Sequence, residues 1–170
     1  WVKKGKAWAQ SMLACRYRDG KGVKKDEKRA VVLLNLAAQQ GDAAAQNDLG
    51  NMYADGRVVE KDENRAIEFY TLAADQGVAS AQYILGIMYE NGRGVDTDEN
   101  RAVEFYTLAA DQGHVVAQFN LGVMYERGLG VDKDENHAVE LYTLAAVHGY
   151  ASAQFNLGIM YENGQGVEPD

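Results

Sequence analysis

The apolar and small residues of this chain recur at a helical spacing, and the whole pattern returns about every 36 residues. In the clearest copy, Ala81, Leu85, Met88 and Tyr89 fall on one stripe of a helix that turns about 100° per residue. This stripe predicts an amphipathic helix over roughly 79–91. A repeat of this length is typical of a solenoid, in which each unit buries its apolar face by stacking on its neighbours.

A second helix follows the first in each copy and is preceded by a recurring aspartate. In the third copy this helix is expected over about 99–112. Asp98 stands just before it, where an N-cap side chain accepts hydrogen bonds from free backbone N–H groups. Gly113 stands after it and supplies the positive φ that ends a helix. The residues that we expect this helix to bury are Ala102, Val103, Tyr106, Ala109 and Ala110.

The same caps and stops set the limits of the other units. The cap position is filled by Asp26, Asp62, Asp98 and Asp134, and the stop position by Gly41, Gly77, Gly113 and Gly149. First helices are therefore expected to begin near residues 7, 43, 79, 115 and 151, and second helices near residues 27, 63, 99 and 135. The predicted fold is all-α, a single solenoid of about 4.5 helix–turn–helix repeats. Its units are approximately 6–41, 42–77, 78–113, 114–149 and a truncated 150–170.

Glycines also recur in the middle of the first helices. They are Gly50, Gly86, Gly122 and Gly158. Glycine inside a helix costs about 1 kcal/mol relative to alanine, so its recurrence at one phase indicates a close approach to the paired helix. We expect small alanines of that helix to face these glycines. A bulky residue at Gly122 would then overpack the contact and lower thermal stability.

Two places depart from the repeat. Val58 occupies a turn position that glycine fills in the other units, so the turn over 55–60 is expected to differ in shape. The fifth first helix has no second helix after it, so one flank should be exposed or paired with another molecule. The chain begins at Trp1 rather than Met and stops within a unit, with Asp170 at the position of a tenth cap. We therefore expect it to be an excised piece of a longer protein.

The charge distribution separates the first unit from the rest. The chain has a net charge of −8, yet residues 1–36 hold ten Lys and Arg against three acidic residues, a net +7, and the remainder carries −15. The basic end either steers a charged partner or forms a solvated terminal cap. Terminal repeats are commonly atypical, and this unit has Ala14 and Leu34 where later units have Gly and Tyr. The acidic body argues against nucleic-acid binding, and no apolar run is long enough to span a membrane.

The recurring residues resemble those of the Sel-1-like repeat family, relatives of the tetratricopeptide repeat. The family pattern is met by Ala81, Leu85, Gly86, Tyr89, Gly92, Gly94, Val95, Asp98, Ala109, Ala110 and Gly113, and again from Ala117 to Gly149. The resemblance implies a right-handed α/α superhelix whose first helices line a concave surface, used as a bacterial protein-interaction scaffold. It favours a periplasmic or secreted location over a cytoplasmic one. The cysteine pairs that some bacterial members carry in each repeat are absent, since Cys15 is the single cysteine.

No set of residues indicates catalysis, a cofactor or a metal. The histidines His114, His137 and His148 fall at different repeat phases without i, i+4 spacing, so surface histidines are expected rather than a metal site. The glycine-rich turn at 92–94 follows no strand and lacks the Lys–Ser/Thr of a phosphate loop. The serines have no evident local base. We therefore predict a non-enzymatic protein without cofactors. A cell-wall or β-lactam hydrolase, as proposed for related repeat proteins, and an architectural spacer within a longer protein are the alternatives.

The candidate binding residues lie on the first helices, at a phase that varies between units while the scaffold positions stay fixed. They are Asn47, Asn51, Tyr83, Ile87, Glu90, Phe119, Val123, Glu126, Phe155, Ile159 and Glu162. If this phase faces the concave surface that the resemblance implies, it forms an aromatic and aliphatic groove edged by glutamates. Such a groove suits a peptide with apolar anchors and basic flanks. Alternatively, the aromatic side chains pack between adjacent units, and the exposed end leaves room for end-to-end self-association.

Overall fold

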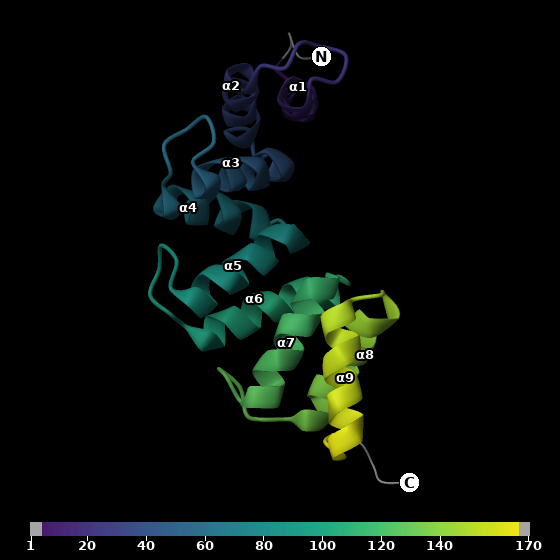
Figure 1. Cartoon of the computed structure of the whole chain (residues 1–170). Helices are drawn as coiled ribbons and strands as arrows, with labels where there is room; N and C mark the ends of the chain where they lie inside the picture. The colour runs from purple at the N-terminus through teal and green to yellow at the C-terminus, as the bar shows by residue number, and fades with distance from the viewer. Residues whose placement is uncertain (1–4, 167–170) are drawn as a thin grey trace. The chain divides into compact units, whose positions relative to one another are not determined.

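The computed structural model describes residues 5–166, and this range contains nine α-helices and no strand (Figure 1). The first helices of the repeats are α1 (Ala7–Asp19), α3 (Ala43–Asp55), α5 (Ala79–Asn91), α7 (Val115–Arg127) and α9 (Ala151–Asn163). The second helices are α2 (Glu27–Ala38), α4 (Glu63–Ala74), α6 (Glu99–Asp111) and α8 (Glu135–Val147). These limits confirm the predicted helix starts and the all-α repeat fold. The chain divides into two compact units, 1–81 and 82–170.

Each second helix begins at an aspartate that caps it. The carboxylates of Asp26, Asp62, Asp98 and Asp134 each accept a hydrogen bond, 3.0 Å long, from the backbone N–H three residues later. This bond satisfies a donor that the helix itself leaves free. The stop glycines follow the second helices at φ values of +80° to +83°. Both sequence predictions are confirmed. Asp170, the predicted tenth cap, lies outside the described residues.

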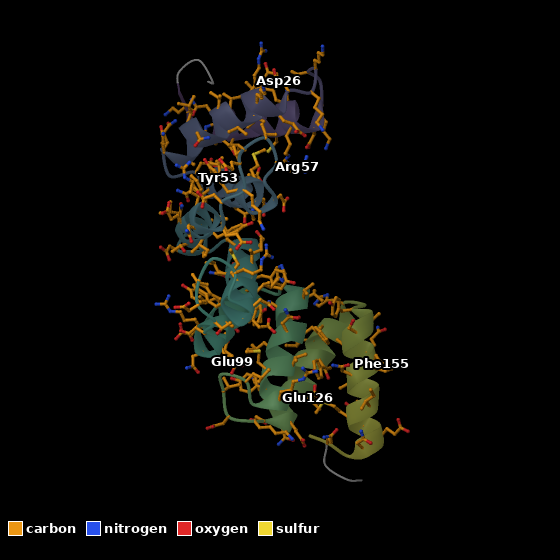
Figure 2. All side chains as sticks on the ribbon, turned by 60° about the vertical axis from the view of Figure 1, so that its left-hand side comes forward. Asp26, Tyr53, Arg57, Glu99, Glu126 and Phe155 are labelled. Atoms are coloured by element: carbon orange, nitrogen blue, oxygen red, sulfur yellow. The ribbon has the colours of Figure 1, made fainter. Side chains whose placement is uncertain are left out.

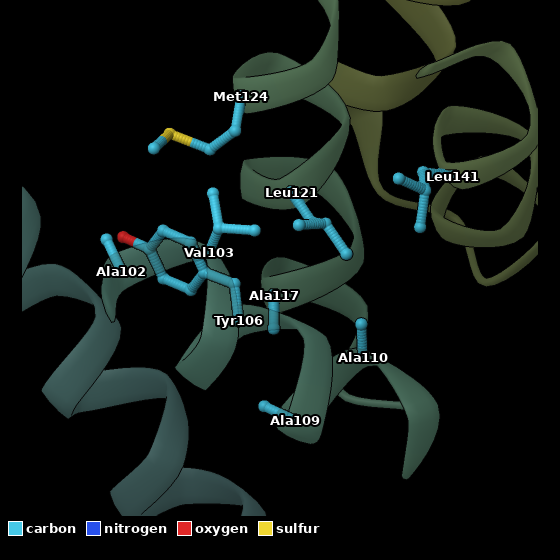
Figure 3. Packing of buried hydrophobic residues seen from close by; sticks show 9 residues of the cluster. All are labelled: Ala102, Val103, Tyr106, Ala109, Ala110, Ala117, Leu121, Met124 and Leu141. Carbon is cyan, nitrogen blue, oxygen red and sulfur yellow. The ribbon is translucent and has the colours of Figure 1, made fainter. Parts of the chain in front are cut away.

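The apolar core of the second unit is built from α6, α7 and α8 (Figure 3). The α6 residues predicted to be buried, Ala102, Val103, Tyr106, Ala109 and Ala110, are all buried. Leu121 and Met124 of α7 and Leu141 of α8 complete the cluster together with Ala117. The small residues on α6 allow α7 to approach it closely, and Tyr106 is the largest buried side chain of the cluster.

Three of the four recurring mid-helix glycines face tyrosine rings, whereas no described atom lies within 4 Å of a Cβ placed on Gly158. A Cβ placed on Gly86 would lie 2.5 Å from Tyr106 Cδ1, and one placed on Gly122 would lie 2.8 Å from Tyr142 Cε1. Gly50 makes the same contact with Tyr70 at 2.6 Å. The prediction of a close approach is confirmed, but the prediction that alanines face these glycines is wrong. The paired helix brings its largest buried side chain to this point, so a Cβ has no room.

In the first repeat, different residues fill the equivalent contact between the two helices. Ala14 stands at the glycine position of α1, and Leu34 stands at the tyrosine position of α2. Both side chains are almost completely buried, at 0% and 1% exposure. A methyl group on one helix is therefore matched by a branched aliphatic side chain on the other. Volume is conserved across the helix pair, which is the kind of exchange that cores tolerate best.

The turn at Val58 has the same backbone conformation as its glycine-containing counterparts, so the prediction of a different shape is wrong. Val58 has a φ of +69°, against +72° for Gly22 and +66° for Gly130. Hydrogen bonds hold both ends of the turn, from Arg57 N–H to the Met52 carbonyl at 3.2 Å and from Asp62 N–H to the Tyr53 carbonyl at 3.0 Å. Because these bonds fix the path of the chain, the valine is held in a left-handed conformation that is unfavourable for a β-branched residue.

Replacing Val58 with glycine is expected to raise the free energy of unfolding by about 1 kcal/mol, because the cost of the left-handed conformation is removed. Chemical denaturation followed by circular dichroism would measure the change. The reverse exchange at Gly22, where an added Cβ meets no atom within 4 Å, should lower stability by a similar amount. A V58G variant no more stable than the parent chain would show that the turn is not strained.

In three repeats, a glutamine just after the second helix donates to a buried glutamine near the start of the first helix before it. The side-chain amide of Gln40 donates to Gln10 at 2.7 Å, and Gln112 donates to Gln82 at 2.6 Å. Gln76 and Gln46 form the same pair at 2.6 Å. In the fourth repeat, His148 replaces the donor. The Oε1 atom of Gln118 is then buried without a hydrogen-bond partner among the described residues.

Replacing His148 with glutamine is expected to raise the free energy of unfolding by about 1 kcal/mol, because the buried Gln118 oxygen gains a donor. Thermal and chemical unfolding of H148Q would test this. The converse variant Q112H should lose about as much, since it removes the donor to Gln82. Equal stability of H148Q and the parent chain would contradict the explanation.

Candidate functional site

A cavity of about 650 Å³ lies over α7 and α9 within the second unit. Four of the predicted binding residues line it, namely Glu90, Phe119, Val123 and Phe155. Asn120 and Asn156 line it as well. Phe155 projects from α9 (Figure 2) and is 68% exposed, which is unusual for a phenylalanine. The cavity therefore combines apolar rings with side-chain amides.

The three aromatic residues predicted at this phase have different surroundings. The Phe119 ring packs against Tyr142 and Tyr150, with centroids 5.5 and 5.1 Å away. Tyr83 lies against Tyr106 at 6.1 Å and stacks on His114 at 4.5 Å. Both rings are half-buried and help to hold neighbouring helices together. This agrees with the alternative interpretation, in which the aromatic side chains pack between adjacent units. Phe155 differs because its ring is open to solvent.

Glu90 and Glu126 hold tyrosine hydroxyls, a role that the sequence did not reveal. The hydroxyl of Tyr106 donates to Glu90 Oε2, and that of Tyr142 donates to Glu126 Oε2, at 2.5 Å in both cases. Hydrogen bonds of this kind to a carboxylate are short and strong. Each one anchors the outer end of the ring that packs on a mid-helix glycine. Glu162, the third predicted glutamate, is exposed on α9.

Burial raises the pKa of Tyr106 and Tyr142 far above the usual value of 10.0, and the hydrogen bonds to Glu90 and Glu126 raise it further. Both hydroxyls therefore stay protonated and keep donating to the carboxylates. His114 is not the surface histidine that we expected. Its Nδ1 accepts a hydrogen bond from Ala117 N–H at 3.2 Å and caps α7, while burial lowers the pKa of its ring. The neutral ring can accept this bond, whereas a protonated ring cannot.

Two predicted residues, Asn47 and Asn51, belong to the first compact unit and do not line this cavity. Asn47 accepts a hydrogen bond from the Ser80 hydroxyl at 3.3 Å, and Asn51 accepts one from the Tyr70 hydroxyl at 2.8 Å. Asn51 thus takes over the role that glutamate plays in the next two repeats. It also lines a smaller cavity of about 290 Å³, next to the ion pair between Arg18 and Asp48.

Ile87, Glu126, Ile159 and Glu162 also lie outside the lining of the larger cavity. Ile87 packs against the core of the second unit. The residues that line the cavity but were missed from the sequence include Asn120, Asn156 and Arg127. Asn120 and Asn156 are 36 residues apart and directly follow the two phenylalanines, so their repetition was a signal that could have identified them.

Within residues 5–166, no group of three or more His, Cys, Asp or Glu side chains is arranged to hold a metal ion. No helix in this range is both long and apolar enough to cross a bilayer.

Comparison with known proteins identifies the repeat. The Sel1 repeat family matches residues 9–42, 43–78, 79–114, 115–150 and 151–170. The chain belongs to the Sel1 repeat family. Its repeats match those of a protective antigen of uropathogenic Escherichia coli strains with an SLR fold, at 38% identity and a TM-score of 0.94. That likeness covers 98% of this chain and 36% of the antigen, so this chain spans about a third of the antigen's length.

Two other solved structures share the fold. A Sel1 repeat protein from Oxalobacter formigenes is 33% identical, with a TM-score of 0.90 over 98% of this chain and 66% of that protein. Helicobacter pylori cysteine rich protein B shares the fold at 24% identity and a TM-score of 0.59, over 78% of this chain and 98% of that protein. No curated protein sequence matches the chain significantly.

The Sel1 chain is expected to lose stability steeply as the pH rises above about 10. Tyr106 and Tyr142 ionise there in the unfolded chain but stay protonated in the folded one, so protons are released on unfolding. Their contribution is fully present below the unfolded pKa and is lost as the pH rises beyond it. Urea unfolding between pH 8 and 11 would measure the slope. A double variant Y106F/Y142F should show a shallower decline, and an unchanged slope would contradict this explanation.

Proposed function

We propose that this Sel1 repeat chain binds a peptide segment of another protein in the cavity over α7 and α9. Sel1 repeats typically mediate protein–protein interactions, and Sel1 scaffold proteins are generally non-enzymatic. The observation that carries the proposal is the exposed ring of Phe155 beside the half-buried Phe119 and Val123, in one open cavity. Exposed aromatic side chains in such a recess are typical of the residues that contribute most of the binding free energy at protein interfaces.

The polar residues of the cavity suit a peptide main chain. Asn120 and Asn156 each carry an amide that can donate and accept, and Ser152 adds a hydroxyl. An extended peptide presents alternating N–H and C=O groups that need such partners. An apolar side chain of the peptide would rest between the two phenylalanine rings.

The charged residues of the cavity favour a peptide with a basic residue near its apolar anchor. Glu90 lines the cavity, and its Oε2 accepts from Tyr106, which leaves Oε1 to meet a cation. Arg127 supplies a guanidinium from α7 that can pair with a carboxylate. Since Glu90 is already oriented by the tyrosine, little side-chain entropy is lost when it binds.

No observation favours the hydrolase alternative. Ser152 is the one serine among the cavity residues, and no histidine lines the cavity to act as its base. The role of an architectural spacer is compatible with peptide binding, because a repeat array can both separate domains and present a surface.

Replacing Phe155 with alanine is expected to weaken peptide binding at least tenfold, because the exposed anchor ring is lost. The probes are 12-residue peptides selected from a random display library on the parent chain. Isothermal titration calorimetry would give their affinities for the parent and for F155A. The melting temperature should stay unchanged, since the side chain is largely exposed.

Two control variants complete this experiment. V147A removes another exposed apolar side chain, 73% exposed on α8 and away from the cavity, and should bind normally. S152R fills the cavity with a long side chain and should block binding. Peptides that bind F155A and S152R as tightly as the parent chain would rule out this cavity as the site.

A further inference from the structure

Each second helix carries a leucine on its exposed side, at the same position of the repeat. These leucines are 43–48% exposed and recur every 36 residues, at Leu36, Leu72, Leu108 and Leu144. A single exposed leucine is common on a protein surface, whereas an apolar position that recurs in register on exposed helix faces indicates an interaction surface.

Acidic residues flank this leucine on α6. Glu104 lies four residues before Leu108 and Asp111 lies three residues after it, so the three side chains share one face of the helix. Both carboxylates are exposed. Helix α4 carries the same residue types at the equivalent positions, namely Glu68, Leu72 and Asp75. We call Glu104, Leu108 and Asp111 the acidic leucine face of α6, which is apolar at its centre and negative at both ends.

The equivalent face of α2 has neither acidic residue. Val32 and Gln39 stand at the two acidic positions, on either side of Leu36. Lys28, one turn before Val32, replaces the asparagine of the later repeats. All four side chains are exposed, Val32 to 61%. We call Lys28, Val32, Leu36 and Gln39 the basic leucine face of α2. Its charge is opposite to that of the α6 face, while the centre of both faces is apolar.

The arginine next to each face does not contribute to this difference. Arg29 of α2 lies 5.7 Å from the centroid of the Tyr17 ring, and Arg101 of α6 lies 5.2 Å from that of Tyr89. Each guanidinium also donates to the hydroxyl of the same tyrosine, at 3.5 and 2.6 Å. Both helices therefore hold an equivalent cation against their own first helix, and the exposed faces differ by the residues at the other positions.

The charges of the two compact units follow the same division. Residues 1–81 hold 13 Lys and Arg against 11 acidic residues, a net +2, whereas residues 82–170 hold 4 against 14, a net −10. Opposite charges attract the first unit of one copy to the second unit of another copy. They also favour α6 over α4 as the acidic partner, because α4 belongs to the positive unit. A second copy of this chain therefore has the charge and the apolar residues that fit each face.

We infer that the basic leucine face of α2 in one copy binds the acidic leucine face of α6 in a second copy. The apolar side chains meet at the centre of the contact, while Lys28 pairs with a carboxylate at its edge. The contact is heterologous, because it joins two different surfaces, so each added copy presents both faces to further copies. None of these residues lines the cavity of the proposed function, so the inference does not rest on it.

Sedimentation velocity of the full 170-residue chain, from micromolar to millimolar concentration, tests this association. The weight-average sedimentation coefficient is expected to rise with concentration in about 50 mM NaCl, and to rise less in about 500 mM NaCl, where surface charges are screened. The variant L108A removes the apolar centre of the α6 face and should weaken association about fivefold. L72A makes the same change at equal exposure on α4 and should associate like the parent chain.

Exchange of charges between the two faces identifies them as partners. The variant K28E/Q39E makes the α2 face acidic, and E104K/D111K makes the α6 face basic, so each variant alone should associate roughly tenfold more weakly than the parent chain. In an equimolar mixture of the two variants, opposite charges meet at every α2–α6 contact. Association of the mixture is therefore expected to return to the level of the parent chain. All four positions are exposed, so circular dichroism should show unchanged helicity.

Three outcomes would overturn the inference. A parent chain that sediments as a monomer at every concentration in low salt would show that a second copy does not occupy these faces. A mixture that associates no more strongly than either variant alone would show that the two faces do not meet. Weaker association of L72A, with L108A unchanged, would place the contact on α4 rather than on α6.

Discussion

The contact between a glycine in one helix and a tyrosine ring in the next determines how the second, third and fourth repeats are assembled. Without a Cβ at Gly86, the ring of Tyr106 lies directly against the α5 backbone. Packing of this kind is specific in position, because a shift of one residue along either helix would bring a side chain into the ring. The helix-interior cost of glycine, about 1 kcal/mol, is offset by the burial of a large aromatic side chain.

The candidate binding surface depends on this contact. The tyrosine that packs on the mid-helix glycine extends its hydroxyl to a carboxylate four residues further along the same face of the first helix, Glu90 or Glu126. The ring of Tyr142 also supports Phe119, which forms part of the cavity wall. Residues that face the cavity are therefore held by the same side chains that hold the helices together. A site supported in this way is rigid before a ligand arrives, which reduces the entropy lost on binding.

The sequence predicted local features well and long-range partners poorly, for a physical reason. Asp98 as a cap and Gly113 as a stop act through backbone groups a few residues away, so their roles follow from position alone. The partner of Gly122 lies 20 residues along the chain, and repetition indicated a close contact without indicating which side chain makes it. The prediction of a different turn at Val58 was wrong because a hydrogen-bonded turn can impose a left-handed conformation even on a residue that disfavours it. The role of Glu90 was missed because its partner, Tyr106, is brought to it by the packing of two helices and leaves no pattern in the local sequence.

Phe119 stands on α7 and Phe155 on α9, so the proposed cavity is complete only while both helices keep their packed positions. Local opening of either helix would separate the two rings and remove the cavity. A peptide bound between the rings would therefore raise the population of the packed state. Binding and local packing are thus coupled, and this coupling is reciprocal.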